Sequence, residues 1–315
     1  MLATLIGEPF DDSAWLFETK WDGVRALCGI EGGKVRLTSR NGKDLLVHFP
    51  ELAELARSFS GTPALLDGEI VTFDSDGRSS FQRLQSRINL VHPVPSRNLV
   101  PVTYVVFDAL YARGRDLRAK SVDERKRVLE AIVRPRDRAA RYSTHVIGRG
   151  CKAFELVVKR GLEGIIGKRR ASVYQERRSQ DWVKIKALFE QEAVIGGWTD
   201  PRGSRTDFGS LLVGVYEEGK FVFVGRVGTG FDRPLLEAIK KRLHPLETQR
   251  PPFAGEFPRD AHWVRPRLVC EVKFSEWTRD GIMRQPVFLG LRTDKAAAEV
   301  VRERPRRHRP KPKPS

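Results

Sequence analysis

The sequence is poor in cysteine, and its three cysteines lie far apart. Cys28, Cys151 and Cys270 form no C-x-x-C pair, and the six histidines are scattered without the spacing of metal ligands. A disulfide framework or a zinc site built on cysteines is therefore not expected. Buried thiols in a reducing compartment are the better interpretation.

Long apolar runs are also missing. No run approaches the roughly 20 residues that a membrane span needs. Residues 1–9 show no basic stretch followed by an apolar one, so we expect no secretory signal, no membrane partner and a cytoplasmic protein. A G-x-x-x-x-G-K-[ST] loop is absent too, which argues against a P-loop ATPase.

Acidic residues are outnumbered by basic ones. The chain has 57 Lys and Arg against 40 Asp and Glu, a net charge of +17. Such an excess attracts polyanions, and nucleic acid is the leading candidate, which would place the protein at the nucleoid. An anionic membrane surface is the alternative, but no basic amphipathic helix is evident. Charge alone does not separate an enzyme from a passive binder.

The 315 residues suggest two domains. The first half contains β-rich runs, which predict strands at 34–38, 64–73, 102–111 and 182–186. Helices are predicted between them, at 50–59, at 121–133 and just before Gly161. The helix at 121–133 opens with a capping-box pattern, Ser121 followed by Glu124.

The pattern changes after Lys186, where short apolar runs alternate with Gly-containing turns. We predict one helix at 232–243 and strands at 193–198, 210–216, 221–227, 268–274 and 287–291. Several strands with one helix in about 110 residues suggest a small barrel such as an OB-fold. The segment after it is rich in Pro and basic residues and is predicted to be disordered.

Seven short motifs carry the functional signal. The first, Lys20 to Arg25, reads K-x-D-G-x-R, and most such strings on their own are solvated turns. Further motifs follow in order at 39–42, 67–69, 104–108, 163–168, 184–186 and 292–295. In this order they resemble the covalent nucleotidyltransferase superfamily and, within it, ATP-dependent DNA ligases. The resemblance is greatest to the ligase module of bacterial non-homologous end-joining ligases.

The resemblance implies an α+β fold. A nucleotidyltransferase (adenylation) domain with antiparallel sheets would cover 1–187, a small OB-fold β-barrel domain 188–302, and a basic disordered tail 303–315. The implied activity is sealing of breaks in duplex DNA through a lysyl-AMP and a DNA-adenylate, in repair by end joining. An RNA ligase or a capping enzyme is one alternative, and a non-catalytic nucleic-acid-binding protein is another.

The resemblance also assigns roles around ATP. Lys20 would be the nucleophile, Glu18 would contact the adenine amino group, and Phe107 would stack on adenine. Arg25 and Glu69 would hold the ribose.

Further residues would hold the phosphates and a metal ion. Arg40 would contact the AMP phosphate and later the 5′-phosphate of the DNA. Glu163 would bind Mg²⁺ or Mn²⁺, with Glu69 assisting. The remaining implied contacts are Lys184 and Lys186 to the α-phosphate, and Arg292, Asp294 and Lys295 to the pyrophosphate end of ATP.

Elementary chemistry agrees with these roles. A lysine amine attacks phosphorus only when neutral, so its pKa of about 10.4 must be lowered or its proton removed. Lys184 and Lys186 fall on one face of a strand, where two like charges favour an anion between them or else a solvated face. Phe107 could equally be core, and Glu69 and Glu163 could belong to plain turns and connections.

Contacts to DNA are expected from a basic loop at 200–209. We predict that Arg202 and Arg205 contact DNA phosphates, against the alternative of an exposed mobile loop. By resemblance, the partners are duplex DNA with nicks or breaks and a Ku-type end-binding protein, and the chain would act as a monomer.

Overall fold

The computed structural model describes residues 1–88, 100–134, 138–187, 189–201 and 207–303. They divide into two compact units, Met1–Ala187 and Leu188–Glu303. Within these ranges no helix is both long and apolar enough to cross a membrane.

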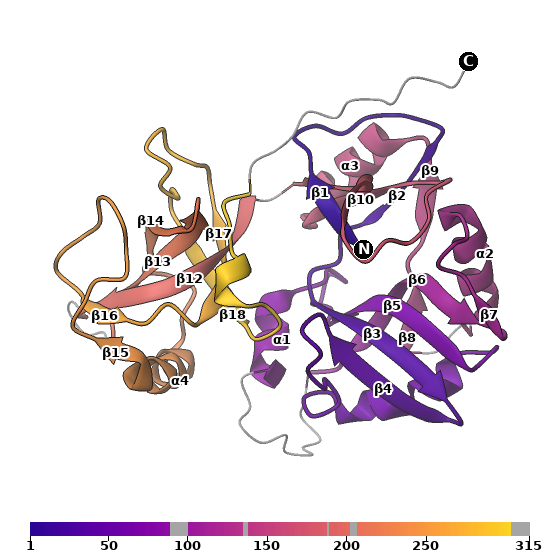
Figure 1. Cartoon of the computed structure of the whole chain (residues 1–315), viewed down its shortest axis with the longest axis horizontal. Coiled ribbons are helices and arrows are strands. Elements are labelled where there is room, and N and C mark those ends of the chain that lie inside the picture. The colour runs from indigo at the N-terminus through magenta and orange to yellow at the C-terminus, as the bar shows by residue number, and fades with distance from the viewer. Residues whose placement is uncertain (89–99, 135–137, 188, 202–206, 304–315) are drawn as a thin grey trace. The chain divides into compact units, whose positions relative to one another are not determined.

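The first unit contains two β-sheets, which Figure 1 shows as separate layers. One sheet has the order β4-β3-β5-β6-β7, with β8 added alongside β6. All its pairs are antiparallel except β6 with β8. The strands are β3 (Val24–Glu31), β4 (Lys34–Ser39), β5 (Ala64–Val71), β6 (Thr103–Ala112), β7 (Arg115–Asp116) and β8 (Ala140–Tyr142).

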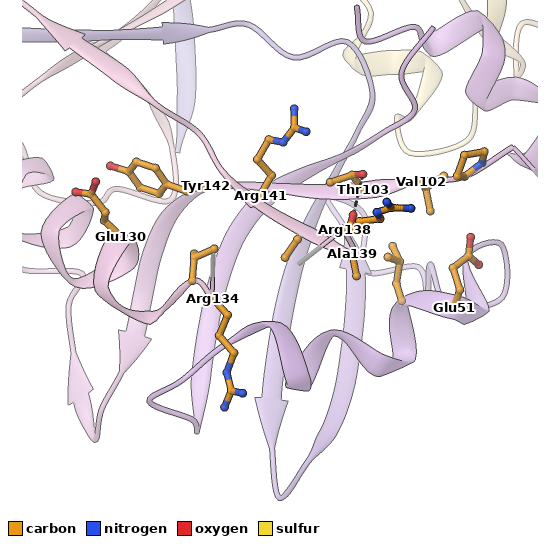
Figure 2. Close-up of a pocket in the computed structure, with 13 residues that line it drawn as sticks. Glu51, Val102, Thr103, Glu130, Arg134, Arg138, Ala139, Arg141 and Tyr142 are labelled. Carbon is orange, nitrogen blue, oxygen red and sulfur yellow. Dashed lines mark hydrogen bonds between the residues drawn. The ribbon is translucent and has the colours of Figure 1, made fainter. Parts of the chain in front are cut away.

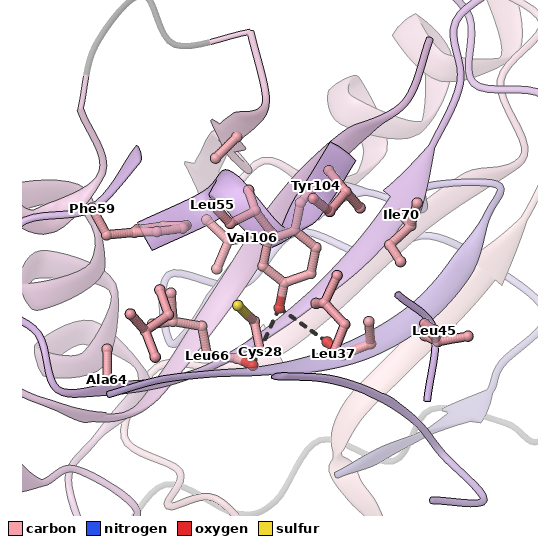
Figure 3. Close-up of a cluster of buried hydrophobic side chains, with 14 of the residues drawn as sticks. Cys28, Leu37, Leu45, Leu55, Phe59, Ala64, Leu66, Ile70, Tyr104 and Val106 are labelled. Atoms are coloured by element: carbon pink, nitrogen blue, oxygen red, sulfur yellow. Dashed lines mark hydrogen bonds between the residues drawn. The ribbon is translucent and has the colours of Figure 1, made fainter. Parts of the chain in front are cut away.

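One face of this sheet supports the main apolar core of the unit (Figure 3). Alternation along β3 places Val24, Ala26 and Cys28 in that core, together with side chains of the 3-10 helix η1 (Pro50–Ser58) and of α1 (Phe81–Ile88). The Tyr104 hydroxyl at its centre donates to the carbonyl of Ala26 at 2.9 Å. The opposite face of the sheet is left for polar side chains.

The second sheet of the unit has the order β1-β11-β10-β2-β9. Its strands are β1 (Leu2–Leu5), β2 (Trp15–Thr19), β9 (His145–Ile147), β10 (Gly164–Arg169) and β11 (Arg178–Lys186). Helix α3 (Gly150–Lys159) contributes Val157 to a small core with Phe17, Ile165 and Ile185. One face of this sheet is therefore apolar as well.

Helix α2 (Val122–Ile132) begins with the predicted capping box: Ser121 accepts from the Glu124 amide, and Glu124 accepts from the Ser121 amide. The helix predicted before Gly161 is α3, and the segment predicted as a helix at 50–59 is a 3-10 helix instead. The elements of this unit that were not predicted are helix α1 and strands β1, β2, β3, β7, β8, β9 and β10.

Among its described residues, the second unit has one seven-stranded sheet and one α-helix. Its strand order is β14-β13-β12-β16-β15, and β17 pairs with both β12 and β18. The elements are β12 (Phe189–Thr199), β13 (Ser210–Glu217), β14 (Lys220–Val227), α4 (Arg233–Leu243), η2 (His244–Leu246), β15 (Glu247–Thr248), β16 (His262–Val264), β17 (Val269–Phe274), β18 (Val287–Arg292) and η3 (Ala297–Glu299). The predicted α+β fold, with mainly antiparallel sheets in the first unit followed by a smaller β-rich unit with one helix, is confirmed.

Candidate active site

Strand register places five polar side chains on one face of the sheet that contains β2. Glu18 pairs with Ile166, which pairs with Lys184, so their side chains share a face. Lys20 follows β2 directly, and its amide donates to the carbonyl of Gly164, which pairs with Lys186. Lys168 lies two positions along β10 on the same face. The residues between them, such as Phe17, Ile165 and Ile185, point to the opposite face and form the small core with α3. Polar and apolar residues therefore alternate along these strands.

The other sheet presents a second set of polar residues. The core takes the even positions of β3 and leaves Arg25 on the far face, opposite Glu69 of β5. Arg25 donates to both carboxylate oxygens of Asp67, at 2.9 and 2.6 Å, and the Tyr174 hydroxyl donates to Asp67 at 2.8 Å. Burial acts to raise the pKa of Asp67, but the charge of Arg25 lowers it below the ordinary value, so Asp67 is an anion.

Lys168 shows that these two faces meet. Its ammonium donates to the Phe107 carbonyl on β6 at 3.0 Å and lies 4.8 Å from the centre of the Phe107 ring. The Arg25 guanidinium is 5.6 Å from the same ring. Phe107 is half-buried and lies outside the apolar core, so the core alternative for it does not hold.

Lys20 forms an ion pair with Glu163, the residue just before β10. Within the described residues, the second carboxylate oxygen of Glu163 is buried and has no hydrogen-bond partner. Carboxylate oxygens of Asp22 and Glu163 lie within 4.8 Å of one another. An orphaned, buried carboxylate oxygen beside a second carboxylate fits a hard divalent cation. Asp22 was not among the predicted metal ligands, although it is the Asp of the K-x-D-G string.

Glu18 is buried, and both of its carboxylate oxygens already accept hydrogen bonds. Lys126 lies 2.8 Å from Oε1, Lys168 donates to both oxygens at 3.2 and 3.1 Å, and the Ser143 hydroxyl donates to Oε2 at 3.2 Å. Burial alone would raise the pKa of Glu18, but the two lysines bring it below its ordinary value. The predicted contact of Glu18 with adenine stays a prediction. Lys126 and Ser143 lie in none of the seven motifs, and they were not predicted as site residues.

The other predicted residues lie elsewhere. Arg40 is exposed in the turn after β4. In the second unit, Arg292 makes a bidentate ion pair with Asp294 at 2.8 Å and a further pair with Glu271, while Lys295 pairs with Glu192. The predicted DNA contacts Arg202 and Arg205, and most of the predicted tail, lie outside the described residues.

A separate hollow of about 980 Å³ lies beside β8 in the first unit (Figure 2). Exposed Arg134, Arg138 and Arg141 line it, and Figure 2 shows their guanidinium groups pointing in different directions around it. Arg141 also lies 5.0 Å from the Phe73 ring, which packs edge-on to Trp21, the neighbour of Lys20. We call this hollow the arginine groove. Glu51 and Glu130 line it as well, so its basic character comes from the three arginines. Arginine side chains with adjoining aromatic rings are typical of nucleic-acid contacts.

Comparison with known proteins defines the class. Residues 2–186 match the family model of the ATP-dependent DNA ligase domain, and residues 204–295 match that of the ATP-dependent DNA ligase C-terminal region. The chain belongs to the ATP-dependent DNA ligase family, and the resemblance seen in its motifs is confirmed.

Individual relatives narrow the class. The chain is 41% identical, over 312 residues, to the multifunctional non-homologous end joining protein LigD of Pseudomonas aeruginosa, covering 96% of this chain and 36% of that protein. It is 42% identical to the LigD end joining DNA repair protein of Mycobacterium tuberculosis, covering 92% and 38%. A mycobacterial DNA ligase D solved with ATP and MES matches with a TM-score of 0.68 and 38% identity, covering 96% and 98%. The chain thus spans little more than a third of the length of these two LigD proteins.

Proposed function

We propose that this chain is an ATP-dependent DNA ligase that seals breaks in duplex DNA, in repair by end joining. The observation that carries the proposal is the pairing of Lys20 with Glu163 on the face of one sheet, opposite Arg25 and Phe107 on the other. A nucleophile, a carboxylate with an oxygen that accepts no hydrogen bond from the described residues, cations and an aromatic ring thereby lie on the two sheet faces that Lys168 connects in the first unit.

The proposed reaction has three transfers. The Lys20 amine attacks the α-phosphorus of ATP, a P–N bond forms, and the bond to pyrophosphate breaks. An oxygen of the DNA 5′-phosphate then attacks the same phosphorus, AMP passes to the DNA, and the amine leaves. Finally the 3′-hydroxyl attacks the 5′-phosphorus, loses its proton, and AMP departs as the phosphodiester forms.

Lys20 must lose its proton before the first attack. In the structure it is paired with Glu163, and such a pair favours the ammonium form. Lys184 and Lys186, on the same sheet face, favour the neutral amine by repulsion and would neutralise the α-phosphate. A divalent cation, when bound, would supply positive charge to the phosphate oxygens. Glu163, Asp22 and the predicted Glu69 are the residues that would hold it.

The two sheets suggest how the nucleotide is held. We propose that Phe107 stacks on adenine, that Arg25 and Glu69 hold the ribose and that Glu18 lies at the adenine amino group. Because Asp67 fixes Arg25 through two hydrogen bonds, the guanidinium is already oriented before ATP binds. We further propose that Arg40 contacts the AMP phosphate and then the DNA 5′-phosphate.

The second unit would act as the OB-fold partner of the adenylation unit, with the boundaries at 187 and 302. Arg292, Asp294 and Lys295 would serve the pyrophosphate end of ATP, which requires Arg292 and Lys295 to exchange carboxylate partners for phosphate. We propose DNA phosphate contacts for Arg202 and Arg205. A Ku-type partner and a monomeric state belong to the same proposal.

The test is adduct formation followed by sealing. Purified protein is offered labelled ATP or GTP with Mg²⁺ or Mn²⁺, and then nicked duplexes with all-DNA or RNA-containing strands. We expect an ATP adduct, none with Lys20→Ala, an unchanged adduct with the exposed control Lys34→Ala, and sealing of DNA. A GTP-only adduct would indicate a capping enzyme, and sealing confined to RNA would indicate an RNA ligase. Absence of any adduct would overturn the mechanism.

A further inference from the structure

Helix α2 contains none of the motifs, yet it buries two consecutive cations. Arg125 and Lys126 are 0% and 2% exposed. Arg125 is paired with Asp108, next to Phe107, and Lys126 with Glu18, two residues before Lys20. The helix thus reaches both sheets that face the candidate site.

Lys126 makes three contacts that fix its ammonium. It lies 2.8 Å from Oε1 of Glu18, donates to the carbonyl of Ser143 at 2.7 Å, and lies 4.1 Å from the centre of the Tyr142 ring. Burial lowers the pKa of Lys126 below its ordinary value, and the charge of Glu18 opposes this. The ammonium therefore joins β2 of one sheet to the segment after β8 of the other.

Ser143 extends the link to the far side of Lys20. Its hydroxyl donates to Oε2 of Glu18 at 3.2 Å and accepts from the Trp21 indole at 3.0 Å. Ser143 is fully buried, so water does not compete for these bonds. The residues two before and one after Lys20 are held by the same serine, and Lys126 holds that serine's carbonyl.

We propose that Lys126 and Ser143 are positioning residues that hold the Lys20 segment in the geometry needed for attack on ATP. The proposal rests on the function proposed above. In-line attack requires the reacting atoms to be about 3–3.5 Å apart, and a displacement of about 1 Å can reduce the rate about 100-fold. Because Glu18 and Trp21, on either side of Lys20, are both held, such a displacement of Lys20 is limited.

Packing alone does not account for Lys126. A buried ion pair is often replaceable by apolar side chains of similar volume without loss of stability. Such side chains would not hold Glu18 and the Ser143 carbonyl in fixed directions. What the ammonium adds is orientation of Glu18 and Ser143, the two residues through which the Lys20 segment is held.

The test compares two steps: formation of the lysyl-AMP adduct, in which Lys20 is the nucleophile, and final sealing, in which it is not. Rates are measured for adduct formation with ATP and for sealing of a nick that already carries a 5′-adenylate, where the 3′-hydroxyl is the nucleophile. For Lys126→Met we expect adduct formation to fall about 100-fold, while sealing of the adenylated nick falls far less. Lys126→Arg should recover part of the loss, and Arg127→Met, exposed on the same helix, should behave like the unsubstituted chain.

Several outcomes would overturn the inference. Adduct formation by Lys126→Met close to that of the unsubstituted chain is one, and equal loss of both reactions in a folded variant is another. If Lys126→Met does not fold, Ser143→Ala carries the test, because it removes both hydroxyl bonds and leaves the Lys126–Glu18 pair in place. If Ser143→Ala then slowed both reactions equally, the proposed positioning role would be wrong. Failure of the unsubstituted chain to form an adduct would instead overturn the proposed function.

Discussion

Replacing Arg125 by methionine should strongly destabilise the first unit. Arg125 and Asp108 are 0% and 1% exposed at the side chain, and they form two hydrogen bonds at 2.8 and 3.0 Å. Arg125 also donates to the carbonyls of Lys120 and Ser172. The substitution leaves a buried carboxylate and two carbonyls without these donors.

Removing one partner of a buried ion pair costs about 3–5 kcal/mol of the free energy of unfolding. For a unit of this size, about 1 kcal/mol corresponds to about 2–4 °C in Tm, so the midpoint should fall by about 6–20 °C. The assay is thermal or urea unfolding followed by tryptophan fluorescence, with Trp15, Trp21 and Trp182 reporting on the first unit.

Arg118 provides the matched control, since it pairs bidentately with Asp116 at the surface of the same unit. Both side chains are about half exposed, so Arg118→Met should lower the free energy of unfolding far less than Arg125→Met does. A double variant, Arg125→Met with Asp108→Leu, should recover much of the stability because it removes the unpaired charge. Equal effects of Arg125→Met and Arg118→Met would refute the reasoning.

Three other outcomes are expected. Gly23→Ala should lower adduct formation about 100-fold, because its Cβ would lie 2.2 Å from the Ile70 carbonyl. The control is Gly29→Ala, within the strand β3 that begins just after Gly23; its Cβ would meet nothing within 4 Å, so it should be neutral. The pKa of Glu18 is below its ordinary value of 4.5, so its ionised form stabilises the fold above that pH and the gain disappears as pH falls. The gap in unfolding free energy between the unsubstituted chain and Glu18→Gln should therefore shrink from pH 7 toward pH 3, and a constant gap would contradict this. Changing the three arginines of the arginine groove, Arg134, Arg138 and Arg141, to glutamine should make the slope of log K for DNA against log salt shallower by about 2–3. An unchanged slope would exclude the groove from DNA contact.

Part of this architecture could be read from the sequence because it depends on local rules. Alternation along a strand predicts that Lys184 and Lys186 share a face, and the register with β10 confirms it. The capping box of α2 is likewise local. Two of the strands that were missed, β2 and β10, carry Glu18 and Lys168. The charges of these residues interrupt the apolar pattern by which buried strands are identified.

Long-range pairing could not be predicted. Arg25 and Asp67 are 42 residues apart, and Lys126 and Glu18 are further apart still, so no periodicity joins them. A lysine on a helix is normally expected at the surface, and only the surrounding sheets make the burial of Lys126 evident. The sequence offered one indication that Asp22 belongs to the site, namely its position two residues after Lys20 in the first motif.

The adjacency of Arg125 and Lys126 has a consequence for the length of the chain before them. Neighbouring side chains leave an α-helix about 100° apart, so one helix can aim two successive cations at two different carboxylates only at a single rotation about its axis. Inserting or deleting one residue at the start of α2 would rotate Arg125 away from Asp108 and Lys126 away from Glu18 at the same time. A substitution, by contrast, removes only one of these two ion pairs. Variation in loop length before Ser121 should thus be tolerated, while a change in length between Ser121 and Lys126 should not.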